Sequence, residues 1–368
     1  MKLLLVLFSL IAIALAFGTH VYLQSKEFDG VEISTIGASL VIKTMIKTVG
    51  ARVKLVESLM PKLNQTSDSL RIETIPITFD TSSSEVYLKE VGEPVAKYAL
   101  RVYQPKQNRD GGYPIVMYIH GGGWMFGNID ISNRLCEGLA NKGFIVVSID
   151  YRRTPEHIFP SCLNDNLNAL SWIGRNYEKY NGNINQLIIS GDSAGGHLAI
   201  TTQIRLFSIQ KKLLERESIP SVTHQALLYP VADFYRYGDE KYESYMKYRD
   251  NGLIIDGAVM DMFWRNFIGN NTEEQVKSNP LISPVSGLIL SDKVLYSQFP
   301  KGFIWLAEYD VLKDEGKSFA NAVNNASPNK LKVKEWKSCV HGFIDLKRNY
   351  DEMADAIYEV LGKINKQS

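Results

Sequence analysis

The pattern of hydrophobic and polar positions predicts an alternation of strands and helices over most of the chain. From Ile72 onward, short apolar runs alternate with amphipathic stretches of helical period. This alternation is typical of an α/β fold, a mostly parallel sheet with helices on both faces. The expected strands lie at residues 85–90, 97–104, 114–119, 144–150, 186–190, 225–229, 301–307 and 331–337. The expected helices lie at residues 132–142, 161–178, 194–215, 314–326 and 349–365.

The stretch from residue 234 to residue 291 interrupts this alternation. It carries aromatic and charged residues and one helix-like run, from about Asp256 to Ile268. We expect it to be an insertion that lies over the ends of the strands. No linker rich in Pro, Gly or Ser divides the chain after Ile72, so residues 72–368 are expected to form one domain that carries this insertion.

The segment before this domain, residues 25–71, has a helical pattern with a mixed face. Its apolar residues fall near helical spacing, and basic residues lie between them. One interpretation is a cap helix packed over the main domain, and the other is a helix lying on a lipid surface. The two interpretations are compatible. The apolar positions are Ile42, Met45, Ile46, Val49, Val53 and Val56.

The chain begins with an apolar run. Residues 3–23 include no Asp, Glu, Lys or Arg, and a helix of this length would rise about 31 Å, close to the thickness of a bilayer core. We therefore predict a transmembrane signal-anchor at residues 1–24, with a cleaved secretory signal as the alternative. Lys2 before the run and acidic residues after it favour a cytosolic N-terminus. The expected location is the endoplasmic reticulum membrane, as a single-pass type II protein with a lumenal body; cleavage would give a secreted protein.

Two further features bear on that topology. Acceptor sequons for glycosylation begin at Asn64, Asn270 and Asn325, and they have meaning only in a lumenal or secreted body. The chain has three cysteines, an odd number that allows at most one internal disulfide. At least one cysteine is therefore expected to be free or paired with another chain.

Composition adds bounds to this picture. The chain has 368 residues, of which 45% are hydrophobic and 22% charged, which is typical of a globular protein with a sizeable core. Its 41 basic and 40 acidic residues give a formal net charge of +1. A broad electrostatic surface for nucleic acid is therefore not expected, and no nucleic-acid partner is predicted.

The run Gly191–Gly196, with the sequence GDSAGG, offers a nucleophile. Ser193 follows a short apolar strand and precedes a helix that begins near Ala194, which is the strand-turn-helix context of a nucleophile elbow. Glycines on both sides relieve crowding in such a turn. Ser193 would then lie at a helix N-terminus, whose free N–H groups favour a negative oxygen nearby. Asp192 is expected to support this motif.

A second run, His120 to Trp124, has three consecutive glycines after a predicted strand. Backbone N–H groups that no side chain shields can point at the oxyanion formed when an ester carbonyl is attacked. The predicted oxyanion hole comprises Gly121, Gly122, Gly123 and Ala194. Gly121 is expected to serve the turn while the other three donate, and His120 to support the motif. The alternative is a flexible loop without this role.

A serine hydroxyl is a poor nucleophile at neutral pH, so a base and an acid that orients the base are needed. Of the six histidines, His341 is chosen because it follows a predicted strand, where its loop can reach back over the strand ends. Asp310 follows another predicted strand, whereas Asp314 and Glu315 are expected to cap the next helix. The order Ser193, Asp310, His341 is that of an α/β-hydrolase.

Five motifs together resemble one family. They are His120–Trp124, Asp150–His157, Gly191–Gly196, Tyr309–Gly316 and His341–Phe343. With them the chain resembles the hormone-sensitive lipase family of α/β-hydrolases, and within it the arylacetamide deacetylase-like members. The resemblance implies an eight-stranded sheet, a helical cap made from the N-terminal segment and the insertion, and hydrolysis of carboxylic esters without a cofactor or metal.

The chain departs from this family in small ways. Arg153 and Thr154 stand where Leu and Ala are usual, and Val311 replaces a common proline after the acid. Neither change removes a required group. Within the same motif, Arg152 and Glu156 are interpreted as braces for the loop near the oxyanion hole.

The expected function is hydrolysis of small apolar esters, lipid or aryl, through an acyl-enzyme on Ser193. An amidase or deacetylase with the same triad is the first alternative, and arylacetamides are included among the candidate substrates. A second alternative is a binding protein that keeps the pocket without turnover. The expected partners are the substrate and, through the anchor, a membrane.

Overall fold

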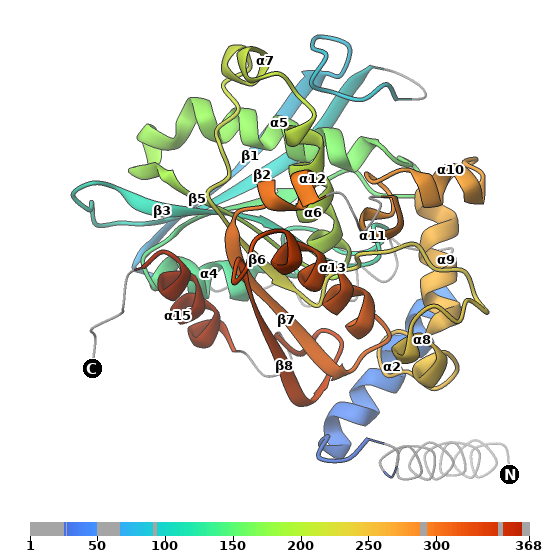
Figure 1. Ribbon diagram of the computed structural model, residues 1–368. Helices are drawn as coiled ribbons and strands as arrows, with labels where there is room; N and C mark the ends of the chain where they lie inside the picture. Colours follow the sequence, from blue (N-terminus) through green and yellow to red (C-terminus); the bar gives the residue numbers. More distant parts are fainter. Residues whose placement is uncertain are drawn as a thin grey trace, which may run out of the picture.

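The computed structural model describes residues 26, 28–49, 67–90, 94–287, 293–344 and 349–362. Its centre is an eight-stranded sheet with the order β1-β2-β4-β3-β5-β6-β7-β8 (Figure 1). The β1–β2 and β2–β4 pairs are antiparallel, and the remaining neighbours are parallel, which confirms the predicted fold class. The strands are β1 (Leu70–Asp80), β2 (Val95–Pro105), β3 (Tyr113–Ile119), β4 (Ile145–Asp150), β5 (Gly182–Asp192), β6 (His224–Leu228), β7 (Lys301–Tyr309) and β8 (Leu331–Val340).

Helices cover both faces of this sheet and its carboxyl-terminal edge. The longer helices are α2 (Ile33–Val49), α4 (Asn133–Asn141), α5 (Ser161–Asn176), α6 (Ala194–Phe207), α9 (Gly257–Ile268), α13 (Lys313–Ala326) and α15 (Tyr350–Val360). The short ones are α7 (Lys211–Arg216), α8 (Glu243–Tyr248), α10 (Glu273–Ser278), α11 (Pro284–Gly287) and α12 (Lys293–Gln298). The predicted helix at 194–215 is thus two helices, because the chain turns after Phe207.

The central strand β3 explains why the sheet needs helices on two sides. Ile115, Met117 and Ile119 pack into the core shared with α5, α6 and α13. Val116 and Tyr118 point the opposite way, into the core shared with α4 and α15. Successive side chains of a strand alternate between faces, so a strand buried on both faces reads as a continuous apolar run.

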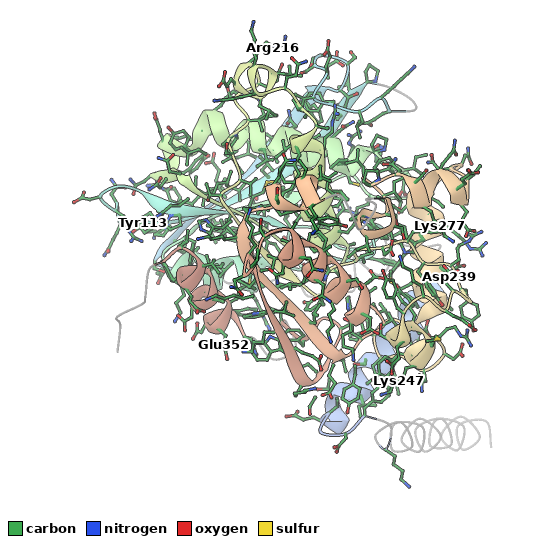
Figure 2. The ribbon with its side chains drawn as sticks, viewed as in Figure 1. Tyr113, Arg216, Asp239, Lys247, Lys277 and Glu352 are labelled. Atoms are coloured by element: carbon green, nitrogen blue, oxygen red, sulfur yellow. The ribbon has the colours of Figure 1, made fainter. Side chains whose placement is uncertain are left out.

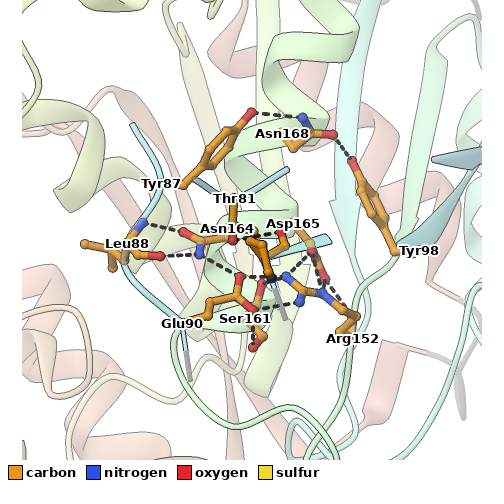
Figure 3. Close-up of polar contacts among 11 residues, drawn as sticks. Thr81, Tyr87, Leu88, Glu90, Tyr98, Arg152, Ser161, Asn164, Asp165 and Asn168 are labelled. Carbon is orange, nitrogen blue, oxygen red and sulfur yellow. Dashed lines mark hydrogen bonds and ion pairs between the residues drawn. The ribbon is translucent and has the colours of Figure 1, made fainter. Parts of the chain in front are cut away.

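Residues 85–90 do not form the predicted strand, and Figure 3 shows the reason. The N–H of Leu88 donates to Asn164 Oδ1 at 2.7 Å, and the carbonyl of Leu88 accepts from Asn164 Nδ2 at 2.8 Å. The side-chain amide of Asn164 therefore makes the two backbone hydrogen bonds that a neighbouring strand would otherwise make. The first strand is instead β1, which the pattern did not predict; it is an edge strand, half exposed along its length and containing Pro76.

The N-terminal helix α2 lies beside α9 of the insertion, at the carboxyl ends of the strands (Figure 1). Lys43 Nζ donates to the carbonyl of Gly252 at 2.7 Å and lies 3.6 Å from Asp256 Oδ2. Phe28 packs edge-on against Tyr309, with ring centroids 5.2 Å apart. The segment therefore contacts both the insertion and the end of β7. The rest of the predicted helical stretch, residues 50–66, lies outside the described residues.

The prediction of a membrane protein of the endoplasmic reticulum is corrected. Across the ranges of the chain that the structure describes, no helix has the length and apolar character needed to span a bilayer. The proposed signal-anchor itself, residues 1–24, lies outside those ranges.

The sequons and cysteines are placed as follows. Asn270 and Asn325 are exposed, and Asn64 lies outside the described residues. Exposure alone does not support glycosylation, because a sequon is modified only in a lumenal or secreted body. None of the three cysteines forms a disulfide, and all three are buried.

Candidate active site

Ser193 occupies a strained turn between β5 and α6. Its backbone has φ +54° and ψ −121°, a region that residues other than glycine rarely adopt. The turn is fixed from outside, since Ser193 N–H donates to the carbonyl of Leu228 at 2.9 Å and its own carbonyl accepts from Val231 N–H at 3.1 Å. Gly195 is required here, because a Cβ at that position would lie 2.0 Å from the carbonyl oxygen of Ile119. The hydroxyl therefore stands at the start of α6, as predicted.

The structure brings His341 and Asp310 to this hydroxyl. Asp310 follows β7 directly and His341 follows β8 directly, so both side chains stand at the carboxyl edge of the sheet. His341 Nε2 lies 2.9 Å from Ser193 Oγ, and His341 Nδ1 lies 2.7 Å from Asp310 Oδ2. Each side chain is buried. This is the geometry of a nucleophile, a base and an orienting acid.

The carboxylate of Asp310 is held in one orientation. Its Oδ2 faces His341, and its Oδ1 accepts the N–H of Leu312 at 2.9 Å. On the other side of the imidazole, the ring of Tyr229 packs edge-on with centroids 4.8 Å apart. The imidazole of His341 is therefore fixed both by a hydrogen bond and by an aromatic contact.

The glycine loop after β3 has the backbone that its sequence requires. Gly122 has φ +113° and Gly123 has φ +61°, and a Cβ at Gly122 would lie 2.1 Å from the carbonyl oxygen of Phe126. No described residue accepts a hydrogen bond from the amide of Gly122, Gly123 or Ala194. These three amides are available to a negatively charged oxygen.

Gly121 differs from the other glycines of the loop. Its N–H donates to Asp192 Oδ1 at 2.9 Å, and the same oxygen accepts the hydroxyl of Tyr118 at 2.7 Å. The amide of Gly121, which was included in the predicted oxyanion hole for its part in the turn, is therefore occupied. Asp192 ties the glycine loop to the nucleophile turn; burial raises the pKa of this carboxyl.

His120 is a structural residue. Its ring stacks on Tyr151 with centroids 4.4 Å apart, and its Nδ1 lies 2.7 Å from the carbonyl oxygen of Gly121. Burial lowers the pKa of His120 to about 3, so the ring stays neutral. The Tyr151 hydroxyl donates to the His120 carbonyl at 3.0 Å, and Thr154 N–H donates to that of Trp124 at 2.9 Å. Both ends of the glycine loop are thus held by the segment after β4.

Arg152 anchors that segment. Its guanidinium lies 2.7 Å from Glu90 Oε2 and 2.8 Å from Asp165 Oδ1 in a buried network (Figure 3). The sequence predicted a bracing role for Arg152, but it did not predict the two carboxylates that bind its guanidinium. Glu156, predicted as a second brace, is exposed.

One contact with the glycine loop comes from the insertion and was not predicted. Phe263 of α9 lies so close to Gly123 that a Cβ there would be 2.4 Å from the ring. The same ring packs against Phe126 with centroids 5.9 Å apart. The only signal in the sequence was the aromatic content of the insertion. Within the described residues, no group of His, Cys, Asp or Glu side chains is arranged to hold a metal ion.

Comparisons with known proteins identify the fold and the family of this chain. A family model described as alpha/beta hydrolase fold matches residues 116–345. The chain is 29% identical over 266 residues to the carboxylesterase NlhH of Mycobacterium tuberculosis, covering 72% of this chain and 75% of that protein. It is 28% identical over 288 residues to an arylesterase of Saccharolobus solfataricus, covering 78% and 84%. The solved esterase of Pyrobaculum calidifontis is similar with a TM-score of 0.64 and 26% identity, covering 87% and 93%.

The matched span contains the glycine loop and the three residues brought together at Ser193. The glycine loop, Ser193, Asp310 and His341 all lie between residues 116 and 345. The solved relative shares the fold over nearly the whole of its own length. The chain therefore belongs to the alpha/beta hydrolase fold family, in its hormone-sensitive lipase-like branch, and is a carboxylesterase-like enzyme.

Proposed function

We propose that the protein hydrolyses carboxylic esters through an acyl-enzyme on Ser193. His341 takes the hydroxyl proton at Nε2 while Ser193 Oγ bonds to the acyl carbon. The carbonyl electron pair moves to its oxygen, which binds the amides of Gly122, Gly123 and Ala194. The bond to the leaving alkoxide then breaks, and the alkoxide takes the proton from His341. Water repeats the sequence on the acyl-enzyme and releases the carboxylic acid.

One observation carries this proposal. The imidazole of His341 joins Ser193 Oγ, at 2.9 Å, to Asp310 Oδ2, at 2.7 Å, in a buried site. Asp310 can therefore favour the tautomer in which Nε2 is free to accept a proton. The unoccupied amide of Ala194 directly follows the nucleophile in the sequence. The unoccupied amides of Gly122 and Gly123 lie in the loop after β3, the strand that pairs with β5. Both positions support the proposed role of these amides as oxyanion donors.

The substrate class is part of the same proposal. The rings of Trp124, Phe126 and Phe263 gather around the glycine loop, and α9 brings further aromatic residues to it. Such surroundings favour apolar acyl or aryl groups. The proposal includes the resemblance to arylacetamide deacetylase-like enzymes. It also includes a cap, formed by the N-terminal segment 25–71 and the insertion 234–291, that selects the substrate.

Replacement of the nucleophile tests the reaction. Ser193→Ala should lower kcat for p-nitrophenyl butyrate by about 10⁶-fold and abolish labelling by a fluorophosphonate probe. Ser190→Ala is the matched control: this serine is buried nearby on β5, and its hydroxyl donates to the carbonyl of Ala226 at 2.8 Å, away from the triad. A Ser193→Ala protein that hydrolysed the ester at the wild-type rate would refute the proposal.

A substrate series tests the substrate class. Rates for p-nitrophenyl esters of increasing acyl length, and for aryl acetamides, should favour apolar esters over charged ones. Turnover of aryl amides at rates near those of the esters would move the activity toward the deacetylase alternative. Equal rates for charged and apolar esters would contradict the proposed class.

A further inference from the structure

We propose that Ser244, in the insertion, is a positioning residue for the acid of the triad. The inference rests on the proposed function, because it assigns Asp310 the role of orienting His341. Ser244 is in the second position of α8 and is only 2% exposed. The hydrogen bonds of its hydroxyl and of its backbone N–H go to residues 310–314, the acid loop, which runs into the first turn of α13.

Three hydrogen bonds join Ser244 to this loop. Its hydroxyl donates to the carbonyl of Val311 at 2.7 Å and accepts the N–H of Asp314 at 3.3 Å. Its backbone N–H donates to Asp314 Oδ2 at 2.7 Å. Both sides of the loop are therefore fixed by one residue of the insertion. Because these groups are buried or half-buried, removal of the hydroxyl leaves the carbonyl of Val311 without its partner.

The rest of α8 is shaped to dock on the same loop. Its outward face carries Lys247, which Figure 2 shows at the periphery of the molecule, whereas Ser244, Tyr245 and Tyr248 are buried. Burial, together with the nearby carboxylates of Glu315 and Asp310, holds the pKa of Tyr245 well above its ordinary value. The inward face of α8 thus lies against the start of α13 and the acid loop.

The loop transmits this contact to the carboxylate of Asp310. Asp310 Oδ1 accepts the N–H of Leu312, which lies between the two positions that Ser244 holds. A loop that shifts at Val311 therefore moves the atom that fixes Asp310. Displacement of a catalytic group by about 1 Å can cost on the order of 10²-fold in rate. We therefore place the insertion in the catalytic assembly as well as against the glycine loop.

A double-mutant cycle tests the proposal. Ser244→Ala should lower kcat for p-nitrophenyl butyrate about tenfold, with KM changed less than twofold. In an Asp310→Asn background, where the acid no longer orients the base, the same substitution should change kcat less than twofold. Equal fold-losses in the two backgrounds, or an unchanged kcat for Ser244→Ala, would overturn it.

Two further variants keep the result decisive. Asp314→Ala removes the carboxylate that accepts the backbone N–H of Ser244. It should lower kcat by a similar factor and add little to the effect of Ser244→Ala. If Ser244→Ala does not fold, Asp314→Ala tests the proposal in its place. Ser283→Ala is the matched control, because this buried serine of the insertion bonds to Asp233 and Phe234 and not to the acid loop. It should leave kcat within twofold of wild type. Loss of activity in Ser193→Ala with a normal Ser244→Ala enzyme would refute this inference alone, whereas an active Ser193→Ala protein would refute the proposed function.

Discussion

The two halves of the site are held by different parts of the molecule. The nucleophile and the glycine loop are fixed by side chains of the central strands and the turns that follow them: Asp192 with Tyr118 on one side, and Tyr151 on the other. The acid half is held from outside the sheet, by Ser244 of the insertion on one flank and by Phe28 against Tyr309 on the other.

The geometry of the two halves is therefore constrained in two different ways. The nucleophile half is built from strands that are buried on both faces, so its geometry follows from the core of the sheet. The acid half depends in addition on segments that dock at the strand ends, α8 of the insertion and the segment around Phe28. Substitutions in the two halves should therefore have different consequences for turnover and for stability.

Apart from the loss of Ser193 itself, the largest effect is expected in the acid half, from Asp310→Asn. An amide in place of the carboxylate favours the wrong tautomer of His341, so kcat for p-nitrophenyl butyrate should fall by about 10⁴-fold while the fold is kept. Asp239→Asn, at the periphery in Figure 2, is the control and should keep full activity. Retention of more than a tenth of kcat by Asp310→Asn would mean that the acid half contributes little to the reaction.

The next effect is expected in the nucleophile half, from Asp192→Ala. The N–H of Gly121 and the hydroxyl of Tyr118 would both lose their acceptor, so the glycine loop should shift and kcat should fall by about 10²-fold. Asp192→Asn keeps an oxygen that can accept both hydrogen bonds and should stay within about tenfold of wild type. Equal rates for the alanine and asparagine variants would show that this carboxylate does not hold the loop.

A smaller effect should appear where the cap touches the nucleophile half. Gly123→Ala places a methyl group 2.4 Å from the ring of Phe263 and adds backbone strain at φ +61°, so kcat/KM should fall about tenfold. Adding Phe263→Ala should recover part of this loss, because only the backbone strain would remain. No recovery in the double variant, measured over a series of acyl lengths, would exclude the ring as the cause.

The smallest effect concerns acid stability of the nucleophile half. Burial lowers the pKa of His197 on α6 to about 4, against about 6.5 in the unfolded chain. Between these values the unfolded state binds the extra proton, so stability falls as the pH is lowered from about 6.5 to about 4. His197→Gln should reduce the slope of the free energy of unfolding by up to about 1.4 kcal/mol per pH unit in this window, measured by urea unfolding. An unchanged slope would show that His197 is protonated in the folded protein.

The sequence predicted most of the nucleophile half, because its chemistry lies in short contiguous motifs. The GDSAGG run and the glycine triplet specify their own turns, and strands buried on both faces give long apolar runs. Ser193, Asp310 and His341 were placed at strand ends, where the structure has them. The roles assigned to these residues stay predictions until the variants are measured.

The contacts that cross between distant segments could not be read in the same way. Asn164 replaces a strand for Leu88, and Arg152 joins Glu90 to Asp165, through side chains that carry no local signal of their partners. Ser244 is one serine among many in the chain, and only the docking of α8 reveals what it holds. The prediction of a membrane location rested on the length of the apolar run at residues 3–23 and on the charges beside it, and it is corrected because no helix among the described residues is long and apolar enough to span a bilayer.

The docking of α8 also sets a rule for protein engineering. Exchanging the insertion with that of a relative would test the proposed role of the insertion in substrate selection, because the insertion places Phe263 against the glycine loop. The exchange would also remove the hydrogen bond from the Ser244 hydroxyl to the carbonyl of Val311. A chimaera that keeps residues 241–248 from this chain, with crossover points outside α8, should change selectivity without losing turnover.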